Sequence, residues 1–119
     1  MTLWSDTVQD HVSNRRNVGP LETATHQGIA GVPGDGPYMR LWFEVREGRI
    51  LRAAYQTYGC VAAIASGSIT ATLLTGLPVD RALLLTAQDI LRVLGGLPEG
   101  KEHCAQLAAA AVAKALKGE

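Results

Sequence analysis

The pattern of apolar and charged residues changes at Gly59-Cys60, and this change limits the possible folds of the chain more than any other feature. Before this point, the alternate residues 39, 41, 43 and 45 are all apolar, and three of the four residues 40, 42, 44 and 46 are charged. After it, residues 61–75 are rich in Ala, Ile and Leu and carry no charge. A period of two predicts a half-buried strand, and the uncharged run predicts a buried helix. Strands followed by helices predict an α+β fold, with helices packed on a small antiparallel sheet of about three strands.

The strand pattern extends on both sides of a short turn. One face of residues 38–46 would carry Met39, Leu41, Phe43 and Val45, and the other Arg40, Trp42, Glu44 and Arg46. Glu47-Gly48 is suited to a hairpin turn, and residues 50–58 resume as a second strand. This second strand would place Leu51, Ala53, Tyr55 and Thr57 on one face. Glycines and a proline in residues 28–36 predict a mobile loop, entered from a short strand.

Helix signals flank these strands. Residues 4–14 predict a short helix that Ser5 caps and that has Val8 and Val12 on its apolar face. After the buried helix, we expect a short helix near residues 79–85 and another at 87–94, ended by Gly95-Gly96. Residues 101–117 have apolar side chains at helical spacing. The last predicted helix therefore packs one face against the rest of the domain.

Composition narrows the class of protein. The chain has 119 residues, of which 47% are hydrophobic and 18% charged, with 11 basic and 11 acidic side chains. These values predict one globular domain over residues 1–119 and argue against disorder. Nucleic acid is not an expected partner, because there is no basic surplus. We expect no membrane span and no secretion signal, hence a reducing cytoplasmic location.

Two cysteines carry the chemistry that the sequence suggests. Cys60 and Cys104 each fall at the start of a predicted helix, where free N–H groups and the helix dipole stabilise a thiolate. His103 adds an imidazole beside Cys104, and Asp35 in the glycine-rich loop is a candidate fourth ligand. Two sulfurs, one nitrogen and one carboxylate suit zinc or an iron–sulfur cluster.

Plainer interpretations stay open at this level. Cysteines are often small buried apolar residues, and an aspartate in a glycine-rich loop is often a turn residue. His11 and His26 are interpreted as an ordinary helix residue and an ordinary loop residue. A thiol enzyme using Cys60, or Cys104 with His103, is disfavoured because adjacent residues seldom present a base to a nucleophile in good geometry.

Four segments resemble the U-type iron–sulfur cluster assembly scaffolds, the group of IscU and of the NifU N-terminal domain. Residues 4–19 (WSDTVQDHVSNRRNVG) are similar to the family's opening, Y-S-x-x-V-x-D-H-F-x-N-P-R-N-V-G. Residues 31–41 (GVPGDGPYMRL) resemble G-A-P-A-C-G-D-x-M-x-L, and residues 57–68 (TYGCVAAIASGS) resemble T-Y-G-C-G-S-A-I-A-S-S-S. Residues 97–108 (LPEGKEHCAQLA) resemble L-P-P-V-K-x-H-C-S-x-L-A. The resemblance spans nearly the whole chain, in order.

The resemblance implies a non-catalytic scaffold on which a transient 2Fe–2S cluster is built and then passed to acceptor proteins. The family's site uses three cysteines, an aspartate and the histidine before the last cysteine, and many members bind zinc there instead. Cys60, His103 and Cys104 match this pattern. Asp35 stands where the first cysteine is expected, and Pro37 stands where the aspartate is expected. Asp35, Cys60, His103 and Cys104 are therefore the predicted ligands of a 2Fe–2S cluster or Zn²⁺.

The departures from the family pattern bear on which metal species the site would hold. A carboxylate at position 35 retains four ligands but exchanges a soft sulfur for a hard oxygen, which favours zinc over a cluster. An alternative function is thus a zinc-binding interaction or regulatory protein of the same fold that has lost scaffold activity. The partners implied by the resemblance are a cysteine desulfurase, an iron or electron donor, a DnaK-like chaperone system and apo iron–sulfur acceptor proteins. Glu99-Gly100 alters the segment that resembles the chaperone-binding stretch.

Overall fold

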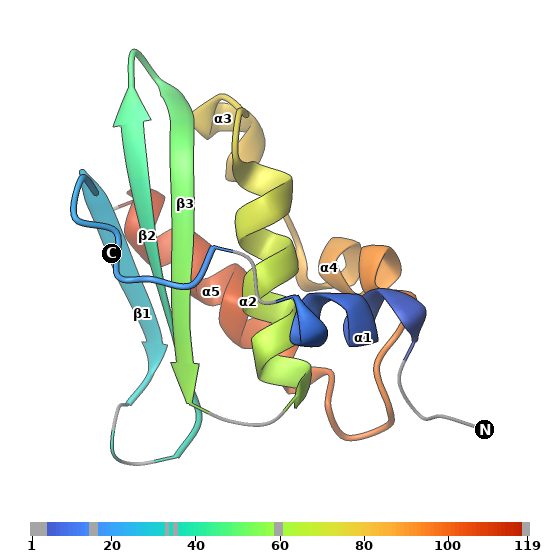
Figure 1. The fold of residues 1–119 in the computed structure, drawn as a ribbon. Coiled ribbons are helices and arrows are strands. Elements are labelled where there is room, and N and C mark those ends of the chain that lie inside the picture. Colours follow the sequence, from blue (N-terminus) through green and yellow to red (C-terminus); the bar gives the residue numbers. More distant parts are fainter. Residues whose placement is uncertain (1–4, 15–16, 33, 35, 59–60, 118–119) are drawn as a thin grey trace.

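The expected α+β architecture is confirmed by a computed structural model, which describes residues 5–14, 17–32, 34, 36–58 and 61–117. Within these residues three strands form one antiparallel sheet in the order β1-β2-β3, and helices pack against it (Figure 1). The strands are β1 (His26–Gly31), β2 (Tyr38–Arg46) and β3 (Arg49–Tyr58). The helices are α1 (Asp6–Ser13), α2 (Val61–Leu74), α3 (Val79–Ala82), α4 (Ala87–Leu94) and α5 (His103–Lys117). No helix among them combines the length and the apolar character needed to cross a bilayer.

The β2–β3 hairpin forms where the alternating pattern predicts it. Arg46 pairs with Arg49, and the two residues between them, Glu47 and Gly48, both have positive φ angles, of 52° and 76°. Two successive positive φ values are typical of the turn that matches the right-handed twist of a hairpin. The glycine-rich segment is less of a loop than expected, because its first part, up to Gly31, belongs to β1.

The predicted face of β3 is wrong at Leu51, and a β-bulge is the reason. Phe43 pairs with Ala53, but Val45 pairs with Ile50, so that the register shifts between Glu44 and Val45. One extra residue in a strand exchanges its two faces from that point on. Ile50 is therefore fully buried in the core, whereas Leu51 is 44% exposed.

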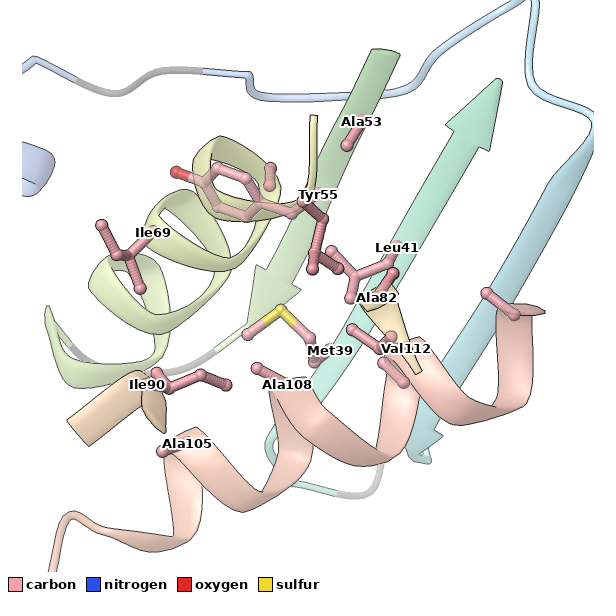
Figure 2. Close-up of a cluster of buried hydrophobic side chains, with 14 of the residues drawn as sticks. Met39, Leu41, Ala53, Tyr55, Ile69, Ala82, Ile90, Ala105, Ala108 and Val112 are labelled. Carbon is pink, nitrogen blue, oxygen red and sulfur yellow. The ribbon is translucent and has the colours of Figure 1, made fainter. Parts of the chain in front are cut away.

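One face of the sheet is covered by helices. The helix α5 packs on β1 and β2, and α2 packs on β3 and on α5. Met39 and Leu41 point from β2 into this layer (Figure 2), and Met39, Leu41 and Phe43 are fully buried. Each contributes roughly 1.5–3 kcal/mol by leaving water. Gly28 lets α5 approach β1, since a Cβ there would lie 2.4 Å from the backbone nitrogen of Ala115.

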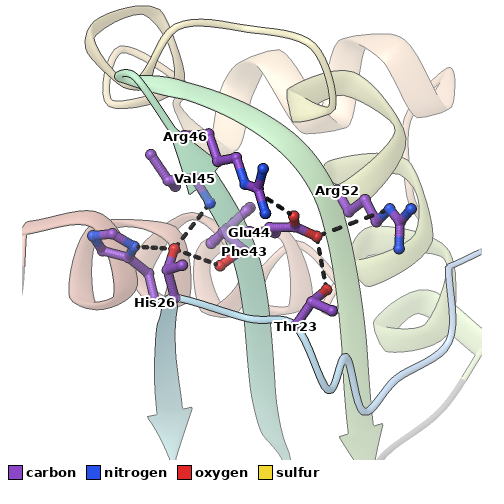
Figure 3. A network of polar contacts seen from close by, with 8 residues as sticks. Thr23, His26, Phe43, Glu44, Val45, Arg46 and Arg52 are labelled. Atoms are coloured by element: carbon purple, nitrogen blue, oxygen red, sulfur yellow. Dashed lines mark hydrogen bonds and ion pairs between the residues drawn. The ribbon is translucent and has the colours of Figure 1, made fainter.

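A polypeptide segment, residues 17–25, covers part of the opposite face (Figure 1). Gly19 lies directly on the Trp42 ring, and its N–H donates to the Tyr55 carbonyl at 2.7 Å. Further along, Thr23 Oγ1 donates to the Glu44 carboxylate at 2.7 Å (Figure 3). These contacts hold the segment against the upper half of the sheet.

The short helix α1 packs on α2 and α4. Ser5 caps it as expected, accepting the Val8 N–H at 3.1 Å, and Ser5 also bonds to the Leu94 carbonyl at the end of α4. His11 lies in α1, as expected of a helix residue, but it is not on the solvent side. Its side chain is buried, and Nδ1 lies 2.7 Å from the buried Ser68 Oγ of α2. His11 therefore helps to attach α1 to the central helix.

Candidate metal centre

The first turn of α5 places two of the predicted ligands side by side. The helix begins at His103, and a bond from the Cys104 N–H to the Lys101 carbonyl at 3.1 Å forms its first turn. Gly100 precedes it with a φ of 87°, a conformation that glycine adopts without strain. This turn brings the Gly100 carbonyl oxygen to within 3.1 Å of His103 Nδ1.

The hydrogen bond to Gly100 determines which nitrogen of His103 is available to a metal. A carbonyl oxygen can only accept, so Nδ1 carries the proton and Nε2 of the neutral ring keeps its lone pair. A backbone carbonyl that orients a histidine through its other ring nitrogen is the usual arrangement around a metal-binding imidazole. The side chain of His103 is exposed, so Nε2 can be reached from solvent.

His103 Nε2 and Cys104 Sγ are 3.6 Å apart. Ligand bonds of about 2.3 Å for sulfur and about 2.05 Å for nitrogen, at a tetrahedral angle, place two such atoms about 3.6 Å apart. The pair is therefore spaced for simultaneous binding of one tetrahedral metal. In the metal-free protein the same spacing lets the thiol and the imidazole contact each other directly.

Cys104 also belongs to a small apolar cluster at the start of α2. It is 1% exposed and packs with Ala62 and Ala63 of the first turn of α2 and with Leu97. The N-terminal ends of α2 and α5 thus meet at the sulfur of Cys104, toward the lower end of the view in Figure 1. This packing shields Cys104 from solvent.

A shallow depression of about 450 Å³ lies on the solvent side of His103. It is lined by His103, Gln106, Leu107 and Ala110 from α5, and by Pro37 from the segment between β1 and β2. The α5 residues follow the helical spacing i, i+3, i+4, i+7, which is visible in the sequence. The side chain of Pro37 has no atom that could bind a metal. Together with Leu107 and Ala110, it makes the lining of the depression mostly apolar.

The four predicted ligands thus divide into two pairs. His103 and Cys104 lie in the described part of the chain and are brought together. Asp35 and Cys60 lie outside the described residues. In the part that is described, no three His, Cys, Asp or Glu side chains gather at one point. His26 begins β1 at the opposite end of the sheet, where its Nδ1 lies 2.8 Å from Thr25 Oγ1.

Comparison with known sequence families shows to which family the chain belongs. Residues 3–118 match the NifU-like N-terminal domain family. The chain belongs to this family. Its membership confirms the resemblance drawn from the four sequence segments. The matched residues include the sheet and the helix α5, which carries His103 and Cys104.

Three iron–sulfur cluster assembly proteins align over most of the chain. One is the iron-sulfur cluster assembly scaffold protein IscU 1 of Archaeoglobus fulgidus, 40% identical over 114 residues, or 96% of this chain and 74% of that protein. The scaffold protein IscU of Aquifex aeolicus is 38% identical over 116 residues, with the same two shares. The iron-sulfur cluster assembly enzyme IscU of Drosophila melanogaster is 38% identical over 120 residues, 98% of this chain and 77% of that one.

Solved structures share the fold. A nitrogen-fixing NifU-like protein (N-terminal) from Brucella abortus superposes with a TM-score of 0.71 at 19% identity, over 97% of this chain and 92% of that one. The protein FiSufU of Fervidobacterium islandicum AW-1 superposes with a TM-score of 0.74 at 17% identity, over 96% of both chains. At these identities the likeness concerns the fold alone.

Proposed function

We propose that this protein is an iron–sulfur cluster assembly scaffold. The observation that carries the proposal is the pair of His103 Nε2 and Cys104 Sγ, 3.6 Å apart, with the nitrogen lone pair left available by the bond to Gly100. Membership of the NifU-like N-terminal domain family and the names of the relatives support it. The cluster is cargo, so the protein holds and releases it rather than catalysing a reaction on a substrate.

We further propose that Asp35 and Cys60 complete the site. The support comes from the described residues near each of them in the chain. Ala62, two residues after Cys60, packs against Cys104, and Pro37, two residues after Asp35, lines the same depression as His103. Two thiolates, one imidazole and one carboxylate would then bind a 2Fe–2S cluster assembled from iron and sulfide.

The partners of the proposed function follow from what the cargo requires. Sulfur would come from a cysteine desulfurase, iron and electrons from a donor protein, and the finished cluster would go to apo acceptor proteins. A DnaK-like chaperone system is a further proposed partner. These exchanges need reduced thiols and therefore a reducing compartment such as the cytoplasm.

A second candidate is a zinc-binding protein of the same fold, with an interaction or regulatory role. The ligand spacing favours it to the same degree, because the 3.6 Å separation follows from zinc bond lengths. Asp35 in place of a cysteine also suits zinc, which accepts oxygen ligands more readily than a cluster does.

Anaerobic reconstitution tests the proposed function. Protein purified without a histidine tag and without oxygen is incubated with ferrous iron and sulfide, and its metal, its sulfide and its visible spectrum are measured. We expect iron and sulfide in equal amounts with charge-transfer absorption. Cys104→Ser should lose more of the cluster than Asp35→Ala, because thiolates dominate cluster binding. His26→Gln, a histidine variant at the opposite end of the sheet, is the matched control and should keep it.

Two other outcomes would change the conclusion. One zinc per chain with no cluster on reconstitution would overturn the scaffold and favour the zinc-binding protein. Equal metal retention in Cys104→Ser and in the unaltered protein would show that the site lies elsewhere.

A further inference from the structure

The described residues cover the outer face of the sheet, opposite α2 and α5, over only half of its length. Cross-strand pairing arranges its side chains in rows. In the row of Gln27, Trp42 and Ala54, Trp42 and Ala54 lie beneath Gly19 of the segment 17–25, and Gln27 is exposed. Two further rows lie closer to the end where β3 stops at Tyr58. No described segment covers these two rows, as the lower half of the sheet in Figure 1 shows.

The uncovered rows carry side chains that are unusual for a solvated face. Ile29, Arg40 and Gln56 form one row, and Gly31, Tyr38 and Tyr58 form the next. The open face of an antiparallel sheet is normally polar. Here, two tyrosines stand directly opposite each other, and Tyr58 is 68% exposed. Tyrosine and arginine are the residue types that most often dominate the energy of protein–protein interfaces.

Arg40 supplies the charge of this surface. Its guanidinium lies 5.8 Å from the centre of the Trp42 ring, a cation–π contact that holds the side chain in place on the sheet. No carboxylate among the described residues forms an ion pair with it. The arginines at the other end of the same face differ, because Arg46 and Arg52 both approach the Glu44 carboxylate, at 3.8 and 3.9 Å (Figure 3). Arg40 is thus a positive charge held in place on the sheet, without an ion-pair partner among the residues that the structure describes.

We propose that Ile29, Tyr38, Arg40, Gln56 and Tyr58 form a docking surface for an acidic segment of a partner protein. A carboxylate of the partner would pair with the Arg40 guanidinium, and an apolar side chain beside it would pack between the two tyrosines. Because Arg40 is already held on Trp42, little side-chain freedom is lost on binding. The surface adjoins the end of the sheet nearest the candidate metal centre, so a partner docked here would sit beside the cargo, but the inference does not depend on any metal.

Peptide binding to the full chain, kept metal-free with a chelator, tests this surface separately from the proposed function. The probe is an acidic hexapeptide, EEFDEL, blocked at both ends, and its neutral match is QQFNQL. Binding is followed by NMR of the backbone amides. We expect the acidic peptide to bind about ten-fold more tightly than the neutral one, because the ion pair is made only with the former. The shifted amides should be those of the two uncovered rows.

Matched variants locate the contact. Arg40→Gln should weaken binding of EEFDEL about ten-fold and remove its advantage over QQFNQL, and Arg40→Lys should recover part of it. Tyr58→Ser, at an exposed position that folding tolerates, should weaken both peptides. Arg46→Gln is the control on the same strand and face, and should bind EEFDEL as the unaltered chain does.

Several results would overturn the proposal. These are equal binding of the two peptides, no binding at millimolar concentration, or loss of binding in Arg46→Gln but not in Arg40→Gln. A dimer that Tyr58→Ser abolishes would show instead that a second copy covers the face. Tighter binding of an oligouridine than of EEFDEL, lost in Arg40→Gln, would assign the face to nucleic acid.

Discussion

Replacing Gly28 with alanine should force α5 away from the sheet. Gly28 lies in β1 beneath the second half of α5, and an added Cβ would meet the Ala115 nitrogen at 2.4 Å, the Ala111 oxygen at 2.7 Å and the Ala115 Cα at 2.8 Å. Ordinary Cβ contacts begin near 3.4 Å, so the helix would have to retreat by about 1 Å. All three atoms belong to the backbone, and no side-chain rotation relieves the clash.

The expected loss of stability is about 2 kcal/mol. Overpacking of this kind lowers the free energy of unfolding by about 3 kcal/mol. Alanine also lowers the conformational entropy of the unfolded chain, which raises the free energy of unfolding by about 0.7 kcal/mol. For a chain of this length about 4 °C of melting temperature corresponds to 1 kcal/mol, so Tm should fall by about 8 °C.

Urea unfolding followed by circular dichroism measures the change, with a thermal scan beside it. Gln27→Ala, at the neighbouring exposed position, is the control and should stay within about 0.5 kcal/mol of the unaltered protein. The double variant with Ala115→Gly decides the reasoning. Because the clash is with backbone atoms, removing the Ala115 methyl group should restore nothing; a full rescue would refute this account.

Three more perturbations test the local energetics. Thr70→Val should leave stability unchanged or raise it by up to about 1 kcal/mol in urea unfolding, since the buried Thr70 hydroxyl has no hydrogen-bond partner among the described residues. The Thr86 backbone N–H, and then its hydroxyl, lower the pKa of Asp89. The stability from this cap is therefore present above about pH 4 and is lost as the pH falls through the lowered pKa; Asp89→Asn should lack this acid-dependent part of the unfolding free energy. Gly100→Ala should cost about 1 kcal/mol and weaken Zn²⁺ binding in a competition titration, because the left-handed turn orients His103. An unchanged zinc affinity would show that the ring needs no such support.

Most of the local structure can be predicted from short stretches of sequence. The alternation in residues 38–46, the Glu47-Gly48 turn, the Ser5 cap and the Gly95 end of α4 each depend on neighbours along the chain. Leu51 shows where such reasoning fails. Either face of β3 could have carried its apolar residues past the bulge, and the choice of Ile50 depends on packing against the helices.

The candidate site shows the same division. The sequence by itself determined the residue types, two cysteines at helix starts with a histidine beside one of them, and the family to which the chain belongs. Only the tertiary structure decided that His103 Nε2 faces Cys104 Sγ at 3.6 Å, that α2 packs over Cys104, and that the described residues leave half of the outer sheet face uncovered beside Arg40. The physical reason is the distance along the chain over which each kind of interaction acts. Caps, turns and periodicity act between residues a few positions apart, whereas a site and a docking surface are made by segments that meet only when the sheet and helices pack.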